Sequence, residues 1–386
     1  MADKEIQPMS AAMKRWQVDD SQNELYTRFR YSPVEGLGYE PGINRRDPSS
    51  IIKVGDLYYI WYTHCADPRF KWLNADLWYA TSSDGHVWTE RGPAVERGAE
   101  GAWDDYSVFT CNILVAKGQY YLVYQAESMP ERGLGINVVG MAKADSPDGP
   151  WEKLPEPVLK TAPDGKFEVP DLTQLHKQKV NEKGSWDSKA VHDPGVLVRD
   201  GKYWLYYKGH GIGDAMFADS KWGVAIAEHP EGPYVKHPLN PITNSGHEVW
   251  VWPWKTGVAA MIDWAGPEKG TIQYAEDGLN FEVMATLEDI PPAGGAYIPD
   301  KFIDTKDGKG FSWGLCHYGR SDWNFLVRFD CDLERDQEKQ LAWSYFQHYS
   351  TIRDVMVNPE RFDVPPKALL GKFHYAAIRK HAGGDT

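Results

Sequence analysis

The sequence predicts an all-β protein, a five-bladed β-propeller that carries an N-terminal helical arm. The main observation is a repeat: an acidic or Trp-Asp lead-in, a turn and an aromatic-rich strand recur five times between residues 45 and 332. Each copy has about the 40 to 50 residues of a four-stranded propeller blade. The 17 Trp, 21 Tyr and 13 Phe residues also suit β-sheet cores. Together these observations favour repeated antiparallel sheets over helices.

Each copy runs from its lead-in through strands separated by turn residues. In the first copy, the turn Gly55-Asp56 precedes an aromatic strand over 57–62, and a further strand over 77–80 ends at the turn 83–85. Such turns join antiparallel strands into hairpins. In chain order the copies begin at Asp47, Trp103, Trp186, Glu248 and Tyr297. Because the inner strands of a propeller run along its axis, the residues that open the copies are expected to meet there.

The segments outside the repeat complete the predicted domain organisation. Ser10 can cap a helix over 11–16, and Ser21 to Glu24 has the pattern of a second capping box. A helix this short is marginal in water unless it packs on something. We therefore predict a helical arm over 1–44, a propeller domain over 45–332 and an extension over 333–386 that packs on the propeller.

Composition narrows the classes of partner. The net charge is −13, with 42 basic and 55 acidic residues, and without a long basic run nucleic-acid binding is disfavoured. No stretch has the length of a membrane span, and the N-terminus has no apolar signal-peptide core. We expect a cytoplasmic protein, or a periplasmic one if a leader was trimmed. The four cysteines show no paired metal-binding spacing.

Three acids open copies of the repeat and are candidate catalytic residues. Asp47 lies in the first copy, Asp193 in the third and Glu248 in the fourth. Glycoside hydrolysis uses two carboxyl groups, or equivalents, one to protonate the leaving oxygen and one to activate water or attack the sugar. The alternative is structural, because Asp-Pro is a turn signal and each acid could cap a blade. Three acids together, with His192 and His247 beside two of them, favour a functional site.

His247 and Glu248 are neighbours, which leaves two arrangements open. In a regular strand their side chains would point to opposite faces, so only one would reach the centre. An irregular start to the strand would let both reach it. A histidine with an ordinary pKa could serve as a general acid at neutral pH, and a structural, hydrogen-bonded histidine is the alternative.

Further residues are predicted to contact the sugar or the acids. The arginines could hold sugar hydroxyls or pair with carboxylates, and exposed Trp rings could stack on a sugar ring. His64, His210 and His317 follow aromatic strands and could face the axis. No cofactor is expected to be required; a divalent cation near the axis is an open alternative whose ligands cannot be assigned. The predicted substrate contacts are Asn44, Arg46, Trp103, His192 and Arg320.

At several motifs the chain resembles the α-neoagaro-oligosaccharide hydrolases, family 117 of the glycoside hydrolases. The matching segments span most of the chain, and their combination is more specific than any one of them. They are Ser10 to Arg15, Gly42 to Pro48, Val191 to Gly195 and Gly246 to Glu248.

The resemblance implies an exo-acting, inverting enzyme that cleaves the α-1,3 bond of neoagarobiose and short neoagaro-oligosaccharides. It would release 3,6-anhydro-L-galactose from the non-reducing end during agar degradation. Asp47 would be the general base and His247 the general acid, with Asp193 and Glu248 completing the site. The resemblance also implies a homodimer in which the N-terminal helices are exchanged between protomers, and a divalent cation near the site in some relatives.

Two alternatives come from other classes. A propeller glycosidase of the arabinanase or β-xylosidase type would use Glu248 as the acid, with His247 in support. A sugar-binding propeller without catalysis would never release product and would tolerate Asp47→Asn. Three acids at one centre argue against the second alternative, because binding alone does not require them.

Overall fold

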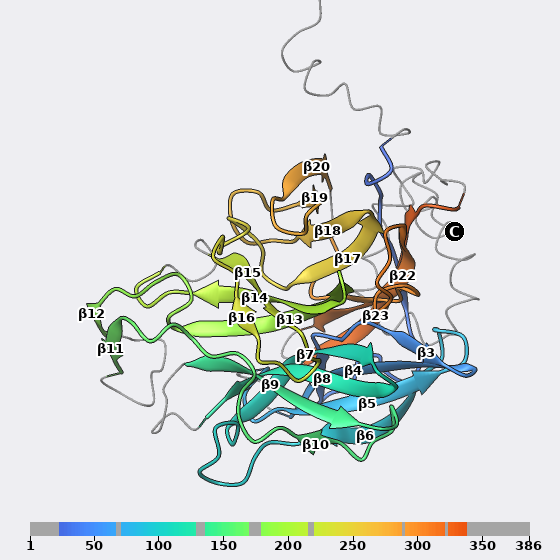
Figure 1. The fold of residues 1–386 in the computed structure, drawn as a ribbon. Helices are drawn as coiled ribbons and strands as arrows, with labels where there is room; N and C mark the ends of the chain where they lie inside the picture. Colours follow the sequence, from blue (N-terminus) through green and yellow to red (C-terminus); the bar gives the residue numbers. More distant parts are fainter. Residues whose placement is uncertain are drawn as a thin grey trace, which may run out of the picture.

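The computed structural model shows an all-β protein (Figure 1). All the regular elements in its described part are strands, and that part has no helix long and apolar enough to cross a membrane. The structure describes residues 23–66, 71–128, 136–169, 179–214, 220–287, 290–320 and 323–337.

Five antiparallel units follow one another along the chain. The first contains β2 (Asn44–Arg46), β3 (Ile52–Val54), β4 (Leu57–Cys65), β5 (Asp76–Ser82) and β6 (Thr89–Val95). The second contains β7 (Ser107–Ala116), β8 (Gln119–Glu127), β9 (Asn137–Ala144) and β10 (Glu152–Lys153). The third contains β13 (Ala190–Arg199), β14 (Lys202–His210), β15 (Lys221–Ala227) and β16 (Val235–Lys236).

The fourth unit contains β17 (Trp250–Lys255), β18 (Gly257–Ile262), β19 (Thr271–Ala275) and β20 (Glu282–Thr286). The fifth contains β21 (Gly295–Ala296), β22 (Gly308–Arg320), β23 (Trp323–Glu334) and the early strand β1 (Arg30–Pro33). A separate hairpin of β11 (Lys166–Glu168) and β12 (Lys179–Glu182) projects from the body at the left of Figure 1.

The prediction of a propeller with five separate blades is wrong as stated. A parallel pair between Ala190 and Asn137 joins the second and third units into one eight-stranded sheet. Pairing of Trp254 with Lys309 joins the fourth and fifth units into another, and the first unit forms a five-stranded sheet. Within the described residues these sheets do not close into a ring. Neighbouring units join because backbone N–H and C=O groups of adjacent strands pair with each other. The pattern of side chains along the sequence does not record this pairing, so the sequence did not predict it.

The predicted helical arm is also wrong where it can be compared with the structure. Residues 23–44 contain no helix, and Arg30 to Pro33 pair antiparallel with β23. Tyr31 in β1 is fully buried, and so is Phe29 directly before the strand. Burial of these two rings against the fifth unit therefore determines the local structure. The helix predicted over 11–16 lies outside the described residues.

Three units have a residue with a left-handed backbone conformation in their first strand or directly after it. Asp47, Thr110 and Asp193 have φ angles of 48°, 38° and 50°. The strand register shifts next to Thr110 and next to Asp193. Such left-handed residues cost roughly 1–3 kcal/mol each and cluster at functional sites. Bulges of this kind redirect a side chain out of the strand's normal alternation.

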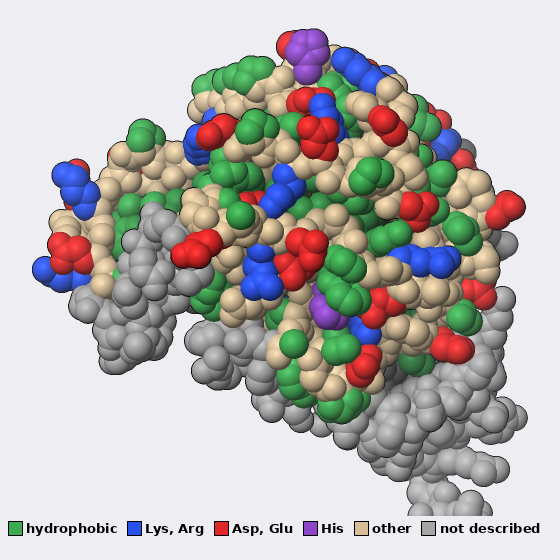
Figure 2. Space-filling model, turned by 90° about the horizontal axis from the view of Figure 1, so that it is seen from below, with side chains coloured by type: hydrophobic (Ala, Val, Ile, Leu, Met, Phe, Trp, Pro, Cys, Tyr) green, Lys and Arg blue, Asp and Glu red, His purple; other side chains and the backbone are tan. Residues whose placement is uncertain are grey.

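Charged side chains are interspersed on the surface. On the face shown in Figure 2, acidic and basic groups lie among one another and among apolar groups. The net charge of −13 is therefore not gathered into one field on this face. A surface of this kind promotes solubility and does not attract a polyanion.

Candidate active site

Asp47 follows β2 and is the most strongly bonded acid of the central cluster. Its carboxylate accepts hydrogen bonds from Arg46 Nε at 2.7 Å and from Thr110 Oγ1 at 3.1 Å. His317 Nδ1 lies 3.0 Å from Asp47 Oδ1. Burial alone would raise the pKa of Asp47, but the charge of Arg46 and the hydrogen bond with His317 outweigh it and hold the pKa far below its ordinary value. Asp47 is therefore an ionised carboxylate at neutral pH.

Asp193 occupies the corresponding place in the third unit and has a different partner. Its carboxylate forms an ion pair with Lys208, and both side chains are buried. Burial, followed by the nearby charge of Glu248, raises the pKa of Asp193 to about 7 despite that ion pair. The two left-handed aspartates therefore differ in how firmly each holds a proton.

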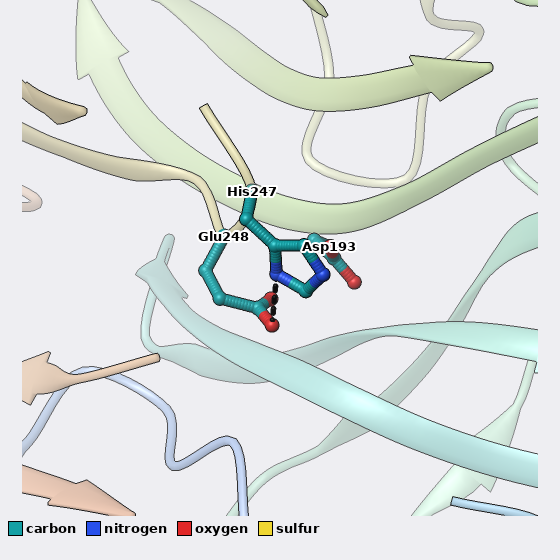
Figure 3. Close-up of side chains that lie close together, drawn as sticks. All are labelled: Asp193, His247 and Glu248. Atoms are coloured by element: carbon teal, nitrogen blue, oxygen red, sulfur yellow. Dashed lines mark ion pairs between the residues drawn. The ribbon is translucent and has the colours of Figure 1, made fainter. Parts of the chain in front are cut away.

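His247 and Glu248 lie together in an irregular segment just before β17. The irregular backbone lets both side chains reach the cluster, which decides between the two predicted arrangements. His247 Nδ1 is 2.8 Å from Glu248 Oε1, and Asp193 lies beside them (Figure 3). Burial and then the charge of Lys208 lower the pKa of His247 well below its ordinary value. Burial and the charge of Asp47 raise the pKa of Glu248. A proton shared by this pair therefore favours the carboxyl group.

Two residues directly after β18 contact this pair. Asp263 Oδ1 accepts a hydrogen bond from the backbone N–H of His247 at 2.7 Å. The indole ring of Trp264 stacks on the imidazole of His247, with ring centroids 4.2 Å apart. Burial and the charge of Glu248 raise the pKa of Asp263 to about 7.

The structure places the predicted substrate contacts in different surroundings. Arg46 pairs with Asp47 and lies over the ring of Trp72, 5.5 Å from its centroid. His192 is near the cluster, with Nδ1 3.7 Å from Asp193 Oδ1. Asn44 is fully buried, and its Oδ1 accepts a hydrogen bond from the backbone N–H of Asn324 at 2.8 Å. The side chain of Arg320 lies outside the described part of the chain.

Trp103 lies within the second unit. Its ring stacks on Tyr124 with centroids 6.3 Å apart, and Nε1 donates to the carbonyl oxygen of Pro155 at 3.0 Å. A β-carbon added at Gly140 would meet the indole of Trp103 at 2.5 Å, so the ring packs directly on β9. These contacts are those of a packing residue.

A cavity of about 400 Å³ lies away from the central cluster, beside the third unit. Four of its polar lining residues are already paired with one another: Lys236 with Asp187, Tyr207 with Asp187, and Asn240 with Tyr207. Paired groups of this kind hold the sheet together and leave little to recognise a ligand. The four predicted catalytic residues do not line this cavity.

The donor atoms near Asp193 do not fit a resident divalent cation as they are arranged. Asp193, His247 and Glu248 offer ligand atoms within 4.8 Å of one another, and carboxylate with imidazole is a common set of metal ligands. However, the ammonium group of Lys208 already lies against Asp193. A cation there would be placed next to a fixed positive charge, which disfavours its binding.

Sequence reasoning missed Lys208, Asp263 and Trp264. Lys208 follows the buried aromatic residues of β14, and a lone charge in a buried strand is the signal that could have identified it. Asp263 and Trp264 carry no motif, because their role depends on where β18 ends. His317, one of three histidines that were expected to be able to face the centre, does contact Asp47.

Comparisons with known proteins also indicate a glycoside hydrolase. A model of glycosyl hydrolases family 43 matches residues 42–167. Zg3597, a family 117 glycoside hydrolase from the marine bacterium Zobellia galactanivorans, is 37% identical, with 82% of this chain and 94% of that chain covered and a TM-score of 0.70. The comparison with curated proteins gave no match.

More distant solved structures share the fold alone. The GH43_1 enzyme of Xanthomonas citri, solved with xylose, is 14% identical, with 77% of this chain and 89% of that chain covered and a TM-score of 0.50. A further structure, named only as a glycoside hydrolase, is 12% identical, with 88% of this chain and 98% of that chain covered and a TM-score of 0.55.

Proposed function

Because the chain belongs to glycoside hydrolase family 117, we propose that this glycoside hydrolase acts on the α-1,3 bond of neoagarobiose and short neoagaro-oligosaccharides. It would remove 3,6-anhydro-L-galactose from the non-reducing end with inversion. The motifs around Asp47, Asp193 and His247 support this substrate, together with the family membership.

One observation carries the chemical part of the proposal: the surroundings of two acids at the site shift their pKa values in opposite directions. Hydrogen bonds and the charge of Arg46 keep Asp47 ionised, whereas burial raises the pKa of Glu248. Pairs of acids whose surroundings drive their pKa values apart supply a base and an acid at the same pH. Asp47 would accept a proton from the attacking water, and Arg46 and His317 hold its carboxylate in place.

The proton for the leaving oxygen would come from the His247–Glu248 pair. Neutral His247 would donate its Nε2 proton to the glycosidic oxygen as that bond breaks. The proton on Glu248 would move to Nδ1 across the 2.8 Å contact, leaving Glu248 as a carboxylate. Bulk water would return the proton after product leaves. Asp193, held by Lys208, would orient the sugar or the pair.

Product analysis tests the proposal directly. Incubation with neoagarobiose is expected to release 3,6-anhydro-L-galactose and galactose, detected by chromatography against standards. Asp47→Asn should abolish turnover but keep substrate binding. Asp84→Asn is a matched control, since Asp84 also lies in the first unit but bonds backbone N–H groups of an exposed turn. Intact neoagarobiose in the presence of wild-type protein would reject this substrate.

The match to family 43 supports a second candidate, an arabinanase or β-xylosidase activity. Aryl arabinosides and xylosides test it in the same assay. Release of the aryl group at a higher kcat/KM than the neoagarobiose reaction would favour this candidate, with Glu248 as the direct proton donor.

We also propose that the chain forms a homodimer through its N-terminal segment. Residues 1–22 lie outside the described residues, and the resemblance at Ser10 to Arg15 supports the proposal. Deleting residues 1–22 should halve the mass measured by light scattering. An unchanged mass would assign the contact to another surface.

A further inference from the structure

We propose that Asp263 and Trp264 are positioning residues that fix the His247–Glu248 pair. Asp263 holds the backbone of the pair, and Trp264 holds the imidazole ring of His247. The inference deepens the proposed function and rests on it for the identity of the proton donor. The two residues follow β18 directly, so a single strand end presents both.

The backbone that carries His247 needs partners from outside its own segment. Residues 247 and 248 precede β17 and belong to no strand, so no sheet ladder bonds their N–H groups. Asp263 supplies acceptors: Oδ1 lies 2.7 Å from the His247 nitrogen and Oδ2 lies 3.5 Å from the Glu248 nitrogen. One buried carboxylate thus faces both members of the pair.

The neighbouring contacts hold the same two segments together. Gly246 N donates to the carbonyl oxygen of Ala265 at 2.9 Å, and the backbone N–H of Glu268 donates to Ser245 Oγ at 2.9 Å. Gly246 has a φ of 116°, and a β-carbon there would meet the ring of Trp222 at 2.5 Å. These contacts hold the segment before His247 next to the residues that follow β18, where Asp263 lies.

Trp264 acts on the side chain. Its indole lies 4.2 Å from the imidazole of His247 at an interplanar angle of 26°. The indole is nevertheless 49% exposed, so burial of its own surface does not explain its position. Stacking limits rotation of the imidazole and keeps Nδ1 directed at Glu248, which is the direction that the proton transfer requires.

The charge of Asp263 supports the same role. Its carboxyl is 5% exposed and lies near the carboxyl of Glu248. Two neighbouring buried acids disfavour each other's ionisation. Glu248 therefore disfavours ionisation of the Asp263 carboxyl, which also accepts the backbone N–H of His247.

The test compares Asp263→Ala, Asp263→Asn and Trp264→Leu in the full chain, with Asp277→Asn as matched control. Asp277 also accepts two backbone N–H bonds in the fourth unit, at 2.8 Å each, but it lies in an exposed turn. Kinetics on neoagarobiose give kcat and KM. Selective isotope labelling of histidine, assigned with His247→Asn, gives the NMR shifts of the His247 ring.

Positioning predicts a loss in kcat with little change in KM. Asp263→Ala should lower kcat about 100-fold, the usual effect of misplacing a reacting group by about 1 Å. Asp263→Asn keeps an acceptor for the His247 N–H and should recover much of that loss. Trp264→Leu should remove the upfield ring-current shift of the His247 ring protons and lower kcat about 10-fold by the same argument. Asp277→Asn should change neither readout.

Three results would overturn the inference: wild-type kcat in Asp263→Ala, an effect of Trp264→Leu on KM alone, or unchanged His247 shifts in Trp264→Leu. If Asp263→Ala does not fold, Asp263→Asn and Trp264→Leu decide the question. If wild-type protein fails to cleave neoagarobiose, the proposed substrate is rejected, and the NMR shifts alone then support or reject the positioning role.

Discussion

The second unit (β7 to β10) and the third unit (β13 to β16) correspond residue for residue at an offset of 83 positions. In both, a Trp-Asp pair precedes the first strand, the Trp ring stacks on a Tyr of the second strand, and a Lys of the fourth strand pairs with the Asp. The left-handed positions match as well, at 110 and 193, 117 and 200. The corresponding pairs are Trp103 and Trp186, Asp104 and Asp187, Tyr124 and Tyr207, Gly140 and Gly223, and Lys153 and Lys236.

The inner ends of the two units differ at the positions that face the site. The left-handed residue is Thr110 in the second unit and Asp193 in the third. The strand residue beside it is Gln125 in the second unit and Lys208 in the third. Thr110 donates a hydrogen bond to Asp47, whereas Asp193 adds a carboxyl of its own with a cation to hold it. The same backbone conformation thus carries a supporting hydroxyl in the second unit and an acid of the site in the third.

Exchanging the left-handed residue should have the largest effect. Asp193→Thr places the second unit's residue in the third unit, where the backbone already suits it. Loss of a group that acts on the proton transfer costs about 10²–10⁴-fold in rate, so kcat on neoagarobiose should fall about 1,000-fold. The thermal midpoint should fall as well, because Lys208 is left buried without its carboxylate. More than a tenth of wild-type activity would show that Asp193 is not part of the reaction.

Exchanging the strand residue should chiefly affect stability. Lys208→Gln leaves Asp193 buried without its cation, and breaking a buried pair costs about 3–5 kcal/mol. Urea unfolding measures the loss. Asp193→Asn combined with Lys208→Gln removes the unpaired charge and should recover much of the stability. A double variant no more stable than Lys208→Gln would mean that Lys208 acts through other contacts.

The outer Trp-Asp-Tyr-Lys clusters should respond alike in the two units. Asp104→Asn and Asp187→Asn each weaken one ion pair whose lysine is partly exposed, which predicts about 1 kcal/mol of lost stability and unchanged kcat. Asp187 also accepts the hydroxyl of Tyr207 at 3.0 Å, so its variant should lose somewhat more. A large loss of activity in Asp187→Asn alone would instead make the cavity beside the third unit part of the function.

A buried lysine outside both units, Lys301, can be compared with Lys208 through the pH dependence of stability. Lys301 contacts the hydroxyl of Ser50, and burial lowers its pKa to about 7, whereas Lys208 has a carboxylate. Between pH 7 and 10 the unfolded chain keeps this proton and the folded chain does not, so the unfolding free energy should rise with pH by up to about 1.4 kcal/mol per unit. The contribution is lost again as pH falls to 7.

Lys301→Met should remove this part of the slope, which denaturant unfolding at pH 7.5, 8.5 and 9.5 measures against wild type. Parallel pH profiles of the two proteins would show that Lys301 stays charged in the folded state.

The sequence indicated the acids but not the groups that hold them. Asp47 and Asp193 were predictable because each lies in an Asp-Pro pair near the start of a copy of the repeat. Lys208 was not, because the register of β14 and the bulge in β13 decide that it meets Asp193. Asp263 was not either, because its partners are backbone groups of a segment sixteen positions away.

The errors in the fold have the same kind of cause. The merging of units into larger sheets depends on backbone pairs such as Asn137 with Ala190, which no side-chain pattern records. Residues 30–33 form a strand because β23 offers them an edge to pair with and a core to pack against. Local helix signals elsewhere in the arm carry no information on that contact.

The central claim is that ionised Asp47 activates water while the His247–Glu248 pair donates the proton to the leaving oxygen. Time-resolved proton NMR of neoagarobiose with wild type and Asp47→Asn tests it most directly. The account predicts that wild type first releases the inverted anomer of 3,6-anhydro-L-galactose and that Asp47→Asn releases none. Release of the retained anomer, or full turnover by Asp47→Asn, would contradict it.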